Sequence, residues 1–167
     1  MSTVQSLLTE FKHEAQTTRK HLERLPNDKL EWRPHQKSFS ASGLASHIVD
    51  CFGWADSIFS ADEYDFDPAT YKPYLASSAD DLLKSFDEKV KTCEQILART
   101  EDSSLEQPWR LKMKGKVWFE KPRASVFRDF ILSHIIHHRG QFSVYLRLLD
   151  ISVPGSYGPS ADEQFPG

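Results

Sequence analysis

The segment from Arg123 to Leu149 places histidines on the apolar side of a predicted helix, and this placement constrains the fold most strongly. Apolar residues recur there at the spacing of an amphipathic helix: Phe127, Ile131, Ile135, Tyr145, Leu148 and Leu149. His134 and His138 fall on the same side. Residues four apart on a helix have Cβ atoms about 5–6 Å apart, so the two rings can reach one point. The pattern therefore predicts a buried helix side that presents a pair of nitrogen donors.

A metal site is one interpretation of this histidine pair. For a single histidine on an apolar side, the commoner outcome is a buried ring bonded to its own chain. Two imidazoles at positions i and i+4 favour a shared partner, because each buried nitrogen without a partner costs free energy. His137 lies about 100° away around the helix, so we expect it at the rim. We therefore predict that His134 and His138 bind a metal ion and that His137 does not.

Length and composition indicate one folded domain covering residues 1–167. The 39% hydrophobic and 12% aromatic content is typical of a globule, and no apolar run approaches the roughly 20 residues of a membrane span. The net charge of −3 gives no general attraction to nucleic acid. The N-terminal residues lack the pattern of a secretory signal. We expect a cytoplasmic protein with neither nucleic acid nor membrane as a partner.

Three further segments have helical periodicity, at residues 3–25, at 40 or 42 to 59, and at 78–100. The second of these carries His47 on its apolar side, between Leu44 and Cys51. Gly53 is expected to be tolerated within this helix at a cost of about 1 kcal/mol. Four amphipathic helices in one domain predict an all-α fold, a four-helix bundle. The core of such a bundle can hold a metal site built from facing helices.

The connections between these helices are expected to be irregular. Residues 60–77 are acidic and aromatic but lack the calcium-loop pattern, so they are predicted to form a solvated loop. Residues 101–122 contain Gly115 and the β-prone run Val117-Trp118-Phe119, which favours a short hairpin or an irregular cover. His13 and His21 have no partner at i+4 and are expected to be exposed.

The two cysteines, Cys51 and Cys93, both lie in predicted helices. A disulfide is not expected in a cytoplasmic protein. Cys93 is interpreted as a core residue. Cys51 follows His47 by four residues, so two interpretations remain: a buried free thiol, which is the commoner outcome, or a thiolate ligand or redox-sensitive neighbour of the metal.

The second helix would present His47 towards His134 and His138. Three imidazoles with an open position are the arrangement of catalytic zinc. Imidazole also suits other divalent ions, so zinc or nickel is expected first, with iron, manganese or copper as alternatives.

An ordered set of motifs resembles the DinB family and its superfamily of DinB/YfiT-like metalloenzymes. The motifs are Leu25-Pro26-Asn27-Asp28-Lys29-Leu30-Glu31-Trp32-Arg33-Pro34, then Leu44-Ala45-Ser46-His47-Ile48, then His134-x-x-x-His138-Arg139-Gly140-Gln141, and finally Val153-Pro154 before Tyr157-Gly158-Pro159-Ser160. The resemblance implies a four-helix bundle, a divalent metal on His47, His134 and His138, and a homodimer. Relatives include transferases and isomerases that use low-molecular-weight thiols such as bacillithiol or mycothiol, while the damage-inducible branch mostly lacks a defined reaction.

The leading functional prediction is therefore thiol S-transfer to a small-molecule substrate, with the metal activating the thiolate of a cofactor. Arg139 is a candidate anchor for an acidic group and Tyr157 a candidate hydrogen-bond donor, with an interhelical salt bridge and a tail anchor as the alternatives. Gln141 is a candidate for a residue that hydrogen-bonds to a metal ligand and orients it, with plain packing as the alternative.

The sequence is also compatible with two other functions. The first is metal-dependent hydrolysis, in which a metal-bound water would need a general base; Asp50 and Asp129 are available. The second is a non-catalytic metal-binding module of a stress response. A measured turnover would distinguish either enzyme from this non-catalytic module.

Overall fold

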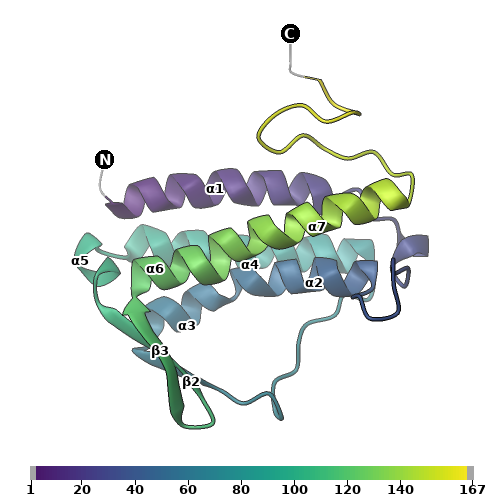
Figure 1. Ribbon diagram of the computed structural model, residues 1–167. Helices are drawn as coiled ribbons and strands as arrows, with labels where there is room; N and C mark the ends of the chain where they lie inside the picture. The colour runs from purple at the N-terminus through teal and green to yellow at the C-terminus, as the bar shows by residue number, and fades with distance from the viewer. Residues whose placement is uncertain (1–2, 165–167) are drawn as a thin grey trace.

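The computed structural model describes residues 3–164. Figure 1 shows long helices lying side by side, with strands below one end of them. The elements in chain order are α1 (Thr3–Leu22), the 3-10 turn η1 (Asn27–Lys29), α2 (Ala41–Phe52), α3 (Trp54–Ser60), β1 (Glu63–Phe66), α4 (Ala79–Arg99), α5 (Asp102–Leu105), β2 (Pro108–Met113), β3 (Lys116–Pro122), α6 (Arg123–Phe127), the π-helix η2 (Arg128–Ser133) and α7 (His134–Leu148).

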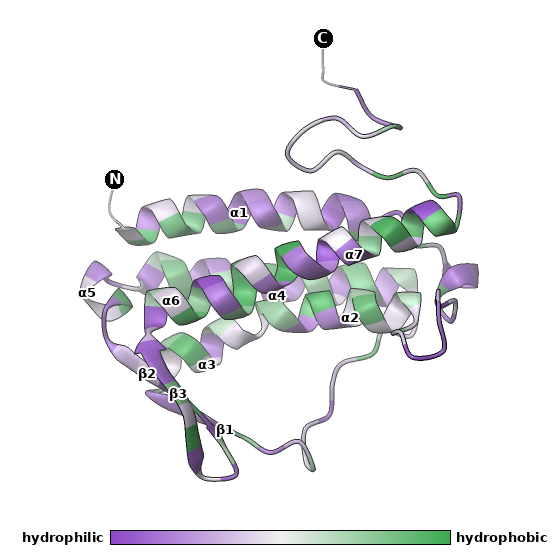
Figure 2. Ribbon diagram, viewed as in Figure 1, coloured by the Kyte–Doolittle hydropathy of each residue, from purple (hydrophilic) through white to green (hydrophobic). Residues whose placement is uncertain are grey.

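The helices α1, α2, α4 and α7 pack as a closed ring. Helix α1 contacts α4 and α7, and α2 contacts the same two helices. Figure 2 shows hydrophobic and hydrophilic residues recurring along each of them, as amphipathic helices require. Large side chains fill the interior, among them Leu7, Phe11, Ile48, Phe52, Phe86, Phe127, Ile135 and Phe142. The ring makes α2 and α7, the two histidine-bearing helices, direct neighbours.

Side-chain caps set the starts of two helices. Ser40 accepts a hydrogen bond from the Gly43 amide at the start of α2, and Ser78 accepts one from the Asp81 amide at the start of α4. The predicted second helix is divided at Gly53 into α2 and α3. A Cβ at this position would lie 3.2 Å from the carbonyl oxygen of Asp50, so the close backbone turn there favours glycine.

The predicted helix from Arg123 to Leu149 is helical as far as Leu148, but it is not uniform. A short α-helix, α6, leads into the π-helix η2, and α7 begins only at His134. π-Helical turns are rare and occur frequently at functional sites. Here the π-helical turn ends directly before the first histidine of the predicted pair.

The prediction of an all-α fold is wrong, because a three-stranded mixed sheet in the order β1-β2-β3 accompanies the helices. Strands β2 and β3 form an antiparallel hairpin. Its turn residues Lys114 and Gly115 have φ values of 50° and 77°, as a type I′ turn requires.

Strand β1 lies in the segment predicted as a solvated loop, and it pairs in parallel with β2. Its four residues alternate charged and aromatic side chains, and Tyr64 and Phe66 are half-buried. The free edge of β2 supplies hydrogen-bond partners that a loop prediction cannot anticipate. The pairing is reinforced by Glu63, which accepts from Lys112 at 2.5 Å.

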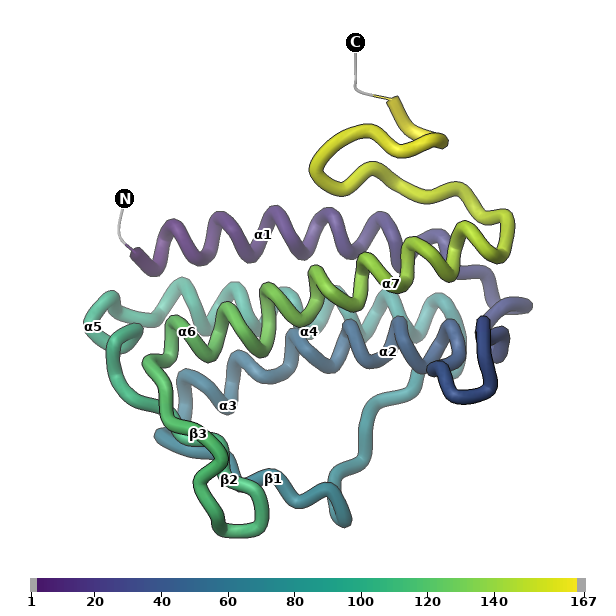
Figure 3. The backbone as a smooth tube through the Cα atoms, in the orientation of Figure 1, coloured from purple at the N-terminus to yellow at the C-terminus, as the bar shows by residue number. Residues whose placement is uncertain are grey.

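The segment after α7 folds back beside α1, as the yellow tube in Figure 3 shows. The hydroxyl group of Tyr157 donates to the Glu14 carboxylate of α1, at 2.9 Å. Within the segment, the Ser160 hydroxyl group donates to the Val153 carbonyl at 2.6 Å. None of the helices formed by residues 3–164 is both long and apolar enough to cross a membrane.

Candidate metal centre

Three imidazole rings meet between α2 and α7. The ring centroid of His47 lies 5.0 Å from that of His134 and 4.6 Å from that of His138, and the latter two are 4.7 Å apart. All three rings are half-buried, whereas His137 is exposed. The three residues predicted as ligands are thus brought together from two helices.

The separation of two ring nitrogens fits a shared cation. Nε2 of His47 and Nε2 of His134 are 3.2 Å apart. Two nitrogens bound to one zinc ion at the usual bond length and in tetrahedral geometry are about 3.3 Å apart. Two unprotonated nitrogens at this distance repel each other unless a proton or a cation lies between them. The donor atoms of this structure therefore fit a divalent metal ion.

Two of the rings form hydrogen bonds with oxygen acceptors of α7 and η2. Nδ1 of His138 lies 2.8 Å from Oε1 of Gln141. An amide oxygen only accepts, so Nδ1 carries the proton and Nε2 keeps its lone pair. His134 is hydrogen-bonded to the backbone of Phe130 in the π-helix η2. Metal-binding histidines usually donate their second ring N–H in this way.

Burial keeps the three imidazoles neutral. It is the largest cause of the lowered pKa of His47 and of His134, and it also lowers the pKa of His138 to about 4. For His138, the hydrogen bond with Gln141 opposes the shift, and the neighbouring histidines add to it. Only the neutral ring has a lone pair for a metal, so the rings are in their ligand form at neutral pH.

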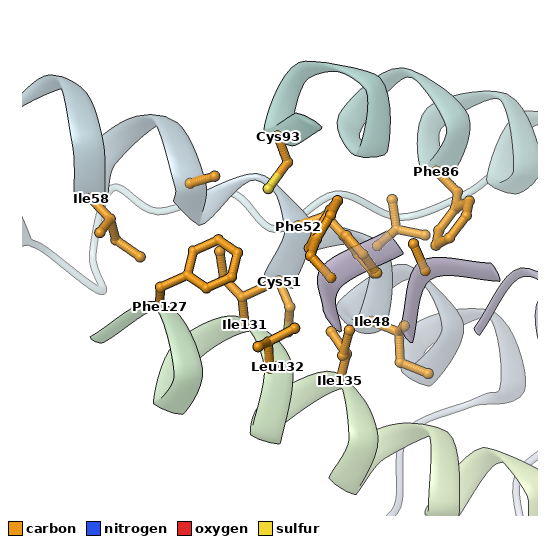
Figure 4. Close-up of a cluster of buried hydrophobic side chains, with 14 of the residues drawn as sticks. Ile48, Cys51, Phe52, Ile58, Phe86, Cys93, Phe127, Ile131, Leu132 and Ile135 are labelled. Atoms are coloured by element: carbon orange, nitrogen blue, oxygen red, sulfur yellow. The ribbon is translucent and has the colours of Figure 1, made fainter. Parts of the chain in front are cut away.

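Cys51 also lies near two of the rings. The donor atoms of His47, Cys51 and His134 all lie within 4.8 Å of one another, and His138 is not part of that group. The thiol of Cys51 donates to the carbonyl oxygen of His47 at 3.2 Å, and burial raises its pKa to about 12. Figure 4 shows this side chain in the buried hydrophobic cluster. Cys51 is thus a buried thiol within reach of two of the rings, and Cys93 is buried as predicted.

Arg139 follows His138 but points away from the three rings. Its side chain is 2% exposed and pairs with the Glu14 carboxylate at 2.7 Å. It also donates to the hydroxyl groups of Thr18 and Tyr157, at 3.1 and 2.7 Å. The guanidinium group is thus committed to an interhelical ion pair and to the tail. A substrate-binding role for Arg139 and Tyr157 stays a prediction.

Phe39 lies beside the rings without a sequence signal to mark it. Phe39 stacks on His47, with ring centroids 5.8 Å apart and 20° between the ring planes. No periodic pattern marks it, because it lies in a loop. His21 was expected to be exposed, and that prediction is wrong: it is 1% exposed, and its Nδ1 donates to the Thr17 carbonyl at 2.9 Å. Its place between Thr18 and Leu22 on the buried side of α1 was the available signal.

Comparison with known proteins agrees with this architecture. The chain is 27% identical, over 96% of its length and 92% of the relative's, to the uncharacterized protein YrdA of Bacillus subtilis strain 168. A DinB-like protein of Bacillus cereus ATCC 10987 has a similar structure, with a TM-score of 0.71, 22% identity, and coverage of 90% of this chain and 95% of that one. The DinB-like protein YjoA of Bacillus subtilis is also similar, with a TM-score of 0.72 and 18% identity. The match covers 96% of this chain and 99% of that one.

These two solved structures support the fold. The family follows from the sequence profile of the DinB family, which matches residues 1–164. The protein with this three-imidazole site belongs to the DinB family.

Proposed function

We propose that this protein binds one divalent metal ion through His47, His134 and His138 and acts as a thiol-dependent transferase on a small-molecule substrate. The observation that carries the proposal is the convergence of the three rings, whose centroids are 4.6, 4.7 and 5.0 Å apart. Zinc or nickel is the proposed metal, because both accept neutral imidazole nitrogens. Cys51 is placed beside the ligands rather than among them, because its thiol already donates to the carbonyl oxygen of His47.

A divalent metal held by these nitrogens would lower the pKa of a coordinated thiol and keep it as the reactive thiolate. The task of the chain is to present neutral, oriented rings. Gln141 orients His138, and the Phe130 backbone orients His134. No nucleophile from the protein is required for this reaction.

The state of the two candidate general bases favours thiol transfer over hydrolysis. Asp50 already accepts from Lys89 at 2.6 Å and from the Tyr74 amide at 2.9 Å. Asp129 already accepts from Lys121 at 2.7 Å. Both carboxylates are thus occupied by a lysine, and neither is a free acceptor for the proton of a metal-bound water.

The ligand set is tested by metal content. Protein purified without a nickel column is measured by inductively coupled plasma mass spectrometry. We expect about one ion per chain in the wild type, and loss of the ion in the His47→Ala, His134→Ala and His138→Ala variants. The matched controls are Cys51→Ser and His137→Ala, both of which should retain the ion. Retention by His138→Ala together with loss in Cys51→Ser would assign the metal to His47, Cys51 and His134 instead.

The reaction is tested with 1-chloro-2,4-dinitrobenzene as the acceptor and bacillithiol, cysteine or coenzyme A as the thiol. In this reaction the thiolate sulfur attacks the ring carbon, a thioether forms and chloride leaves. We expect turnover that disappears with a chelator and returns when the metal is restored. A metal-loaded protein whose product formation is unaffected by chelation, or absent with every thiol, would contradict the transferase and favour the non-catalytic module. The homodimer implied by the family resemblance remains a prediction for sedimentation analysis.

A further inference from the structure

A surface pocket of about 420 Å³ opens beside His138. Ligand pockets for small molecules have volumes of roughly 300–1,000 Å³, so this one can take a small organic molecule. The residues that matter for its chemistry are Lys37, Phe39, Leu44, His138, Val144 and Tyr145. The pocket therefore joins the loop before α2 to the outer side of α7, directly at the three-imidazole site.

The pocket has an apolar wall that the protein itself leaves uncovered. Phe39 is 56% exposed and Val144 is 55% exposed, although both are large hydrophobic residues. Leu44 beneath them is buried. Covering exposed apolar area with an apolar part of a ligand is favourable, at about 25 cal/mol per Å². The ring of Phe39 also stacks on His47, so a ligand that lies against Phe39 lies beside the predicted metal.

This wall is held in place by its own contacts. The Tyr145 hydroxyl group donates to the carbonyl oxygen of Phe39 at 3.2 Å. Trp32 packs edge-on against Tyr145, with ring centroids 5.5 Å apart. Ser40, the next residue after Phe39, caps α2. A wall that is ordered before binding loses little entropy when a ligand arrives.

The pocket also contains a positive charge that is available to a ligand. Lys37 is exposed, and none of the carboxylates in residues 3–164 pairs with its ammonium group. A second cleft, of about 180 Å³ beside Asp50, differs in this respect. There Lys89 is already paired with Asp50 at 2.6 Å. The pocket at His138 thus offers a free cation where the cleft at Asp50 offers a neutralised pair.

We infer that this pocket binds the substrate and that the substrate is a small carboxylic acid with an apolar, preferably aromatic, body. Its carboxylate lies at Lys37 and its body lies against Phe39 and Val144. The inference deepens the proposed function and rests on it only for placing the reacting atom at the histidines.

The test uses the full chain, treated with a chelator so that a carboxylate cannot bind a metal directly. The probes are 4-phenylbutyrate, its neutral analogue 4-phenylbutyramide, and acetate. Backbone amide signals are followed by ¹H–¹⁵N NMR during titration. We expect saturable shifts of Lys37, Phe39 and Val144 with 4-phenylbutyrate, weaker binding of the amide, and the weakest binding of acetate. Shifts centred on the Asp50 cleft or on the tail would overturn the inference.

Two variants separate the charge from the apolar wall. Lys37→Gln should weaken binding of 4-phenylbutyrate by about two- to fivefold, the range of an exposed ion pair, and leave the amide unchanged. Phe39→Ser should weaken the binding of both 4-phenylbutyrate and 4-phenylbutyramide. Lys116→Gln, a change on the distant β3 strand, is the matched control and should change neither. An acid-to-amide affinity ratio that is the same in Lys37→Gln as in the wild type would overturn the assignment of Lys37.

The outcome of this binding test can be told apart from the outcome of the metal-content test. Binding of the acid at Lys37 by a protein that takes up no metal would leave the pocket in place and contradict the metal site. Metal uptake without amide shifts at the pocket would contradict this inference alone.

Discussion

Arg139 and His138 are neighbours in the chain and have opposite environments. One helix step turns Arg139 towards α1, where its charge is paired with Glu14 and its N–H groups have several acceptors. A buried charge without such partners would cost several kcal/mol. The ion pair therefore ties α7 to α1. It contributes to the position of His138 without taking part in the site.

His21 gives a prediction at the same scale. Burial lowers its pKa, and the hydrogen bond to the Thr17 backbone opposes this shift. Below about pH 6.5 the unfolded chain therefore binds a proton that the folded chain does not, so stability falls as the pH decreases from about 6.5 towards the lowered pKa. We expect His21→Gln to lose part of the decrease in the free energy of unfolding between pH 7 and pH 5.

The measurement is urea unfolding of both proteins at the two pH values. His13→Gln is the matched control, because His13 is an exposed histidine on the same helix. It should retain the wild-type dependence on pH. The same decrease in wild type and His21→Gln would show that the buried ring takes up its proton without cost.

At the scale of elements, the backbone departs from regular α-helix or β-strand geometry in two places, the π-helix η2 and the turn of the β2–β3 hairpin. Phe130, whose backbone is hydrogen-bonded to the His134 ring, lies within η2. In the β2–β3 turn the departure lies in the positive φ values of Lys114 and Gly115. The first departure directly precedes a predicted ligand, and the second closes the hairpin to which β1 is added.

Two glycines give a prediction for these elements in which one substitution has opposite effects. Gly115→Ala should lower the free energy of unfolding by about 1–2 kcal/mol, because φ there is +77° and a Cβ is strained in this conformation. Gly140→Ala should raise it by about 0.5–1 kcal/mol, because Gly140 lies within α7 and an added Cβ meets no atom within 4 Å. Urea unfolding measures both. Changes of the same sign would contradict the role given to the backbone angle.

At the scale of the whole molecule, the proposed metal binding would be coupled to folding, because the proposed ligands come from α2 and α7 and meet only in the folded chain. We expect a divalent metal at 100 times its dissociation constant to stabilise the fold by about 2.7 kcal/mol, seen as a higher melting temperature. A chelator should reverse the change. A His134→Ala/His138→Ala double variant should show no change. An equal rise in wild type and the double variant would place the stabilising ion elsewhere.

The helices and the histidine cluster were predictable because their signals are local. The spacing of apolar residues along 123–149 identifies the inner side of a helix whatever it packs against, and His134 and His138 share that side by their spacing alone. Glu14 had the same kind of signal, because it lies three residues after Phe11 on the buried side of α1. The spacing does not predict which cation pairs with its carboxylate.

What only the tertiary structure decided are the features that depend on a distant partner. Strand β1 exists because the edge of β2 offers it hydrogen bonds, and four residues alone carry too little signal for a strand. The pairing of Arg139 with Glu14 and the burial of Cys51 depended on which segments surround them in the folded chain. Periodicity is a property of one segment, whereas strand pairing, ion pairing and desolvation are properties of two segments brought together.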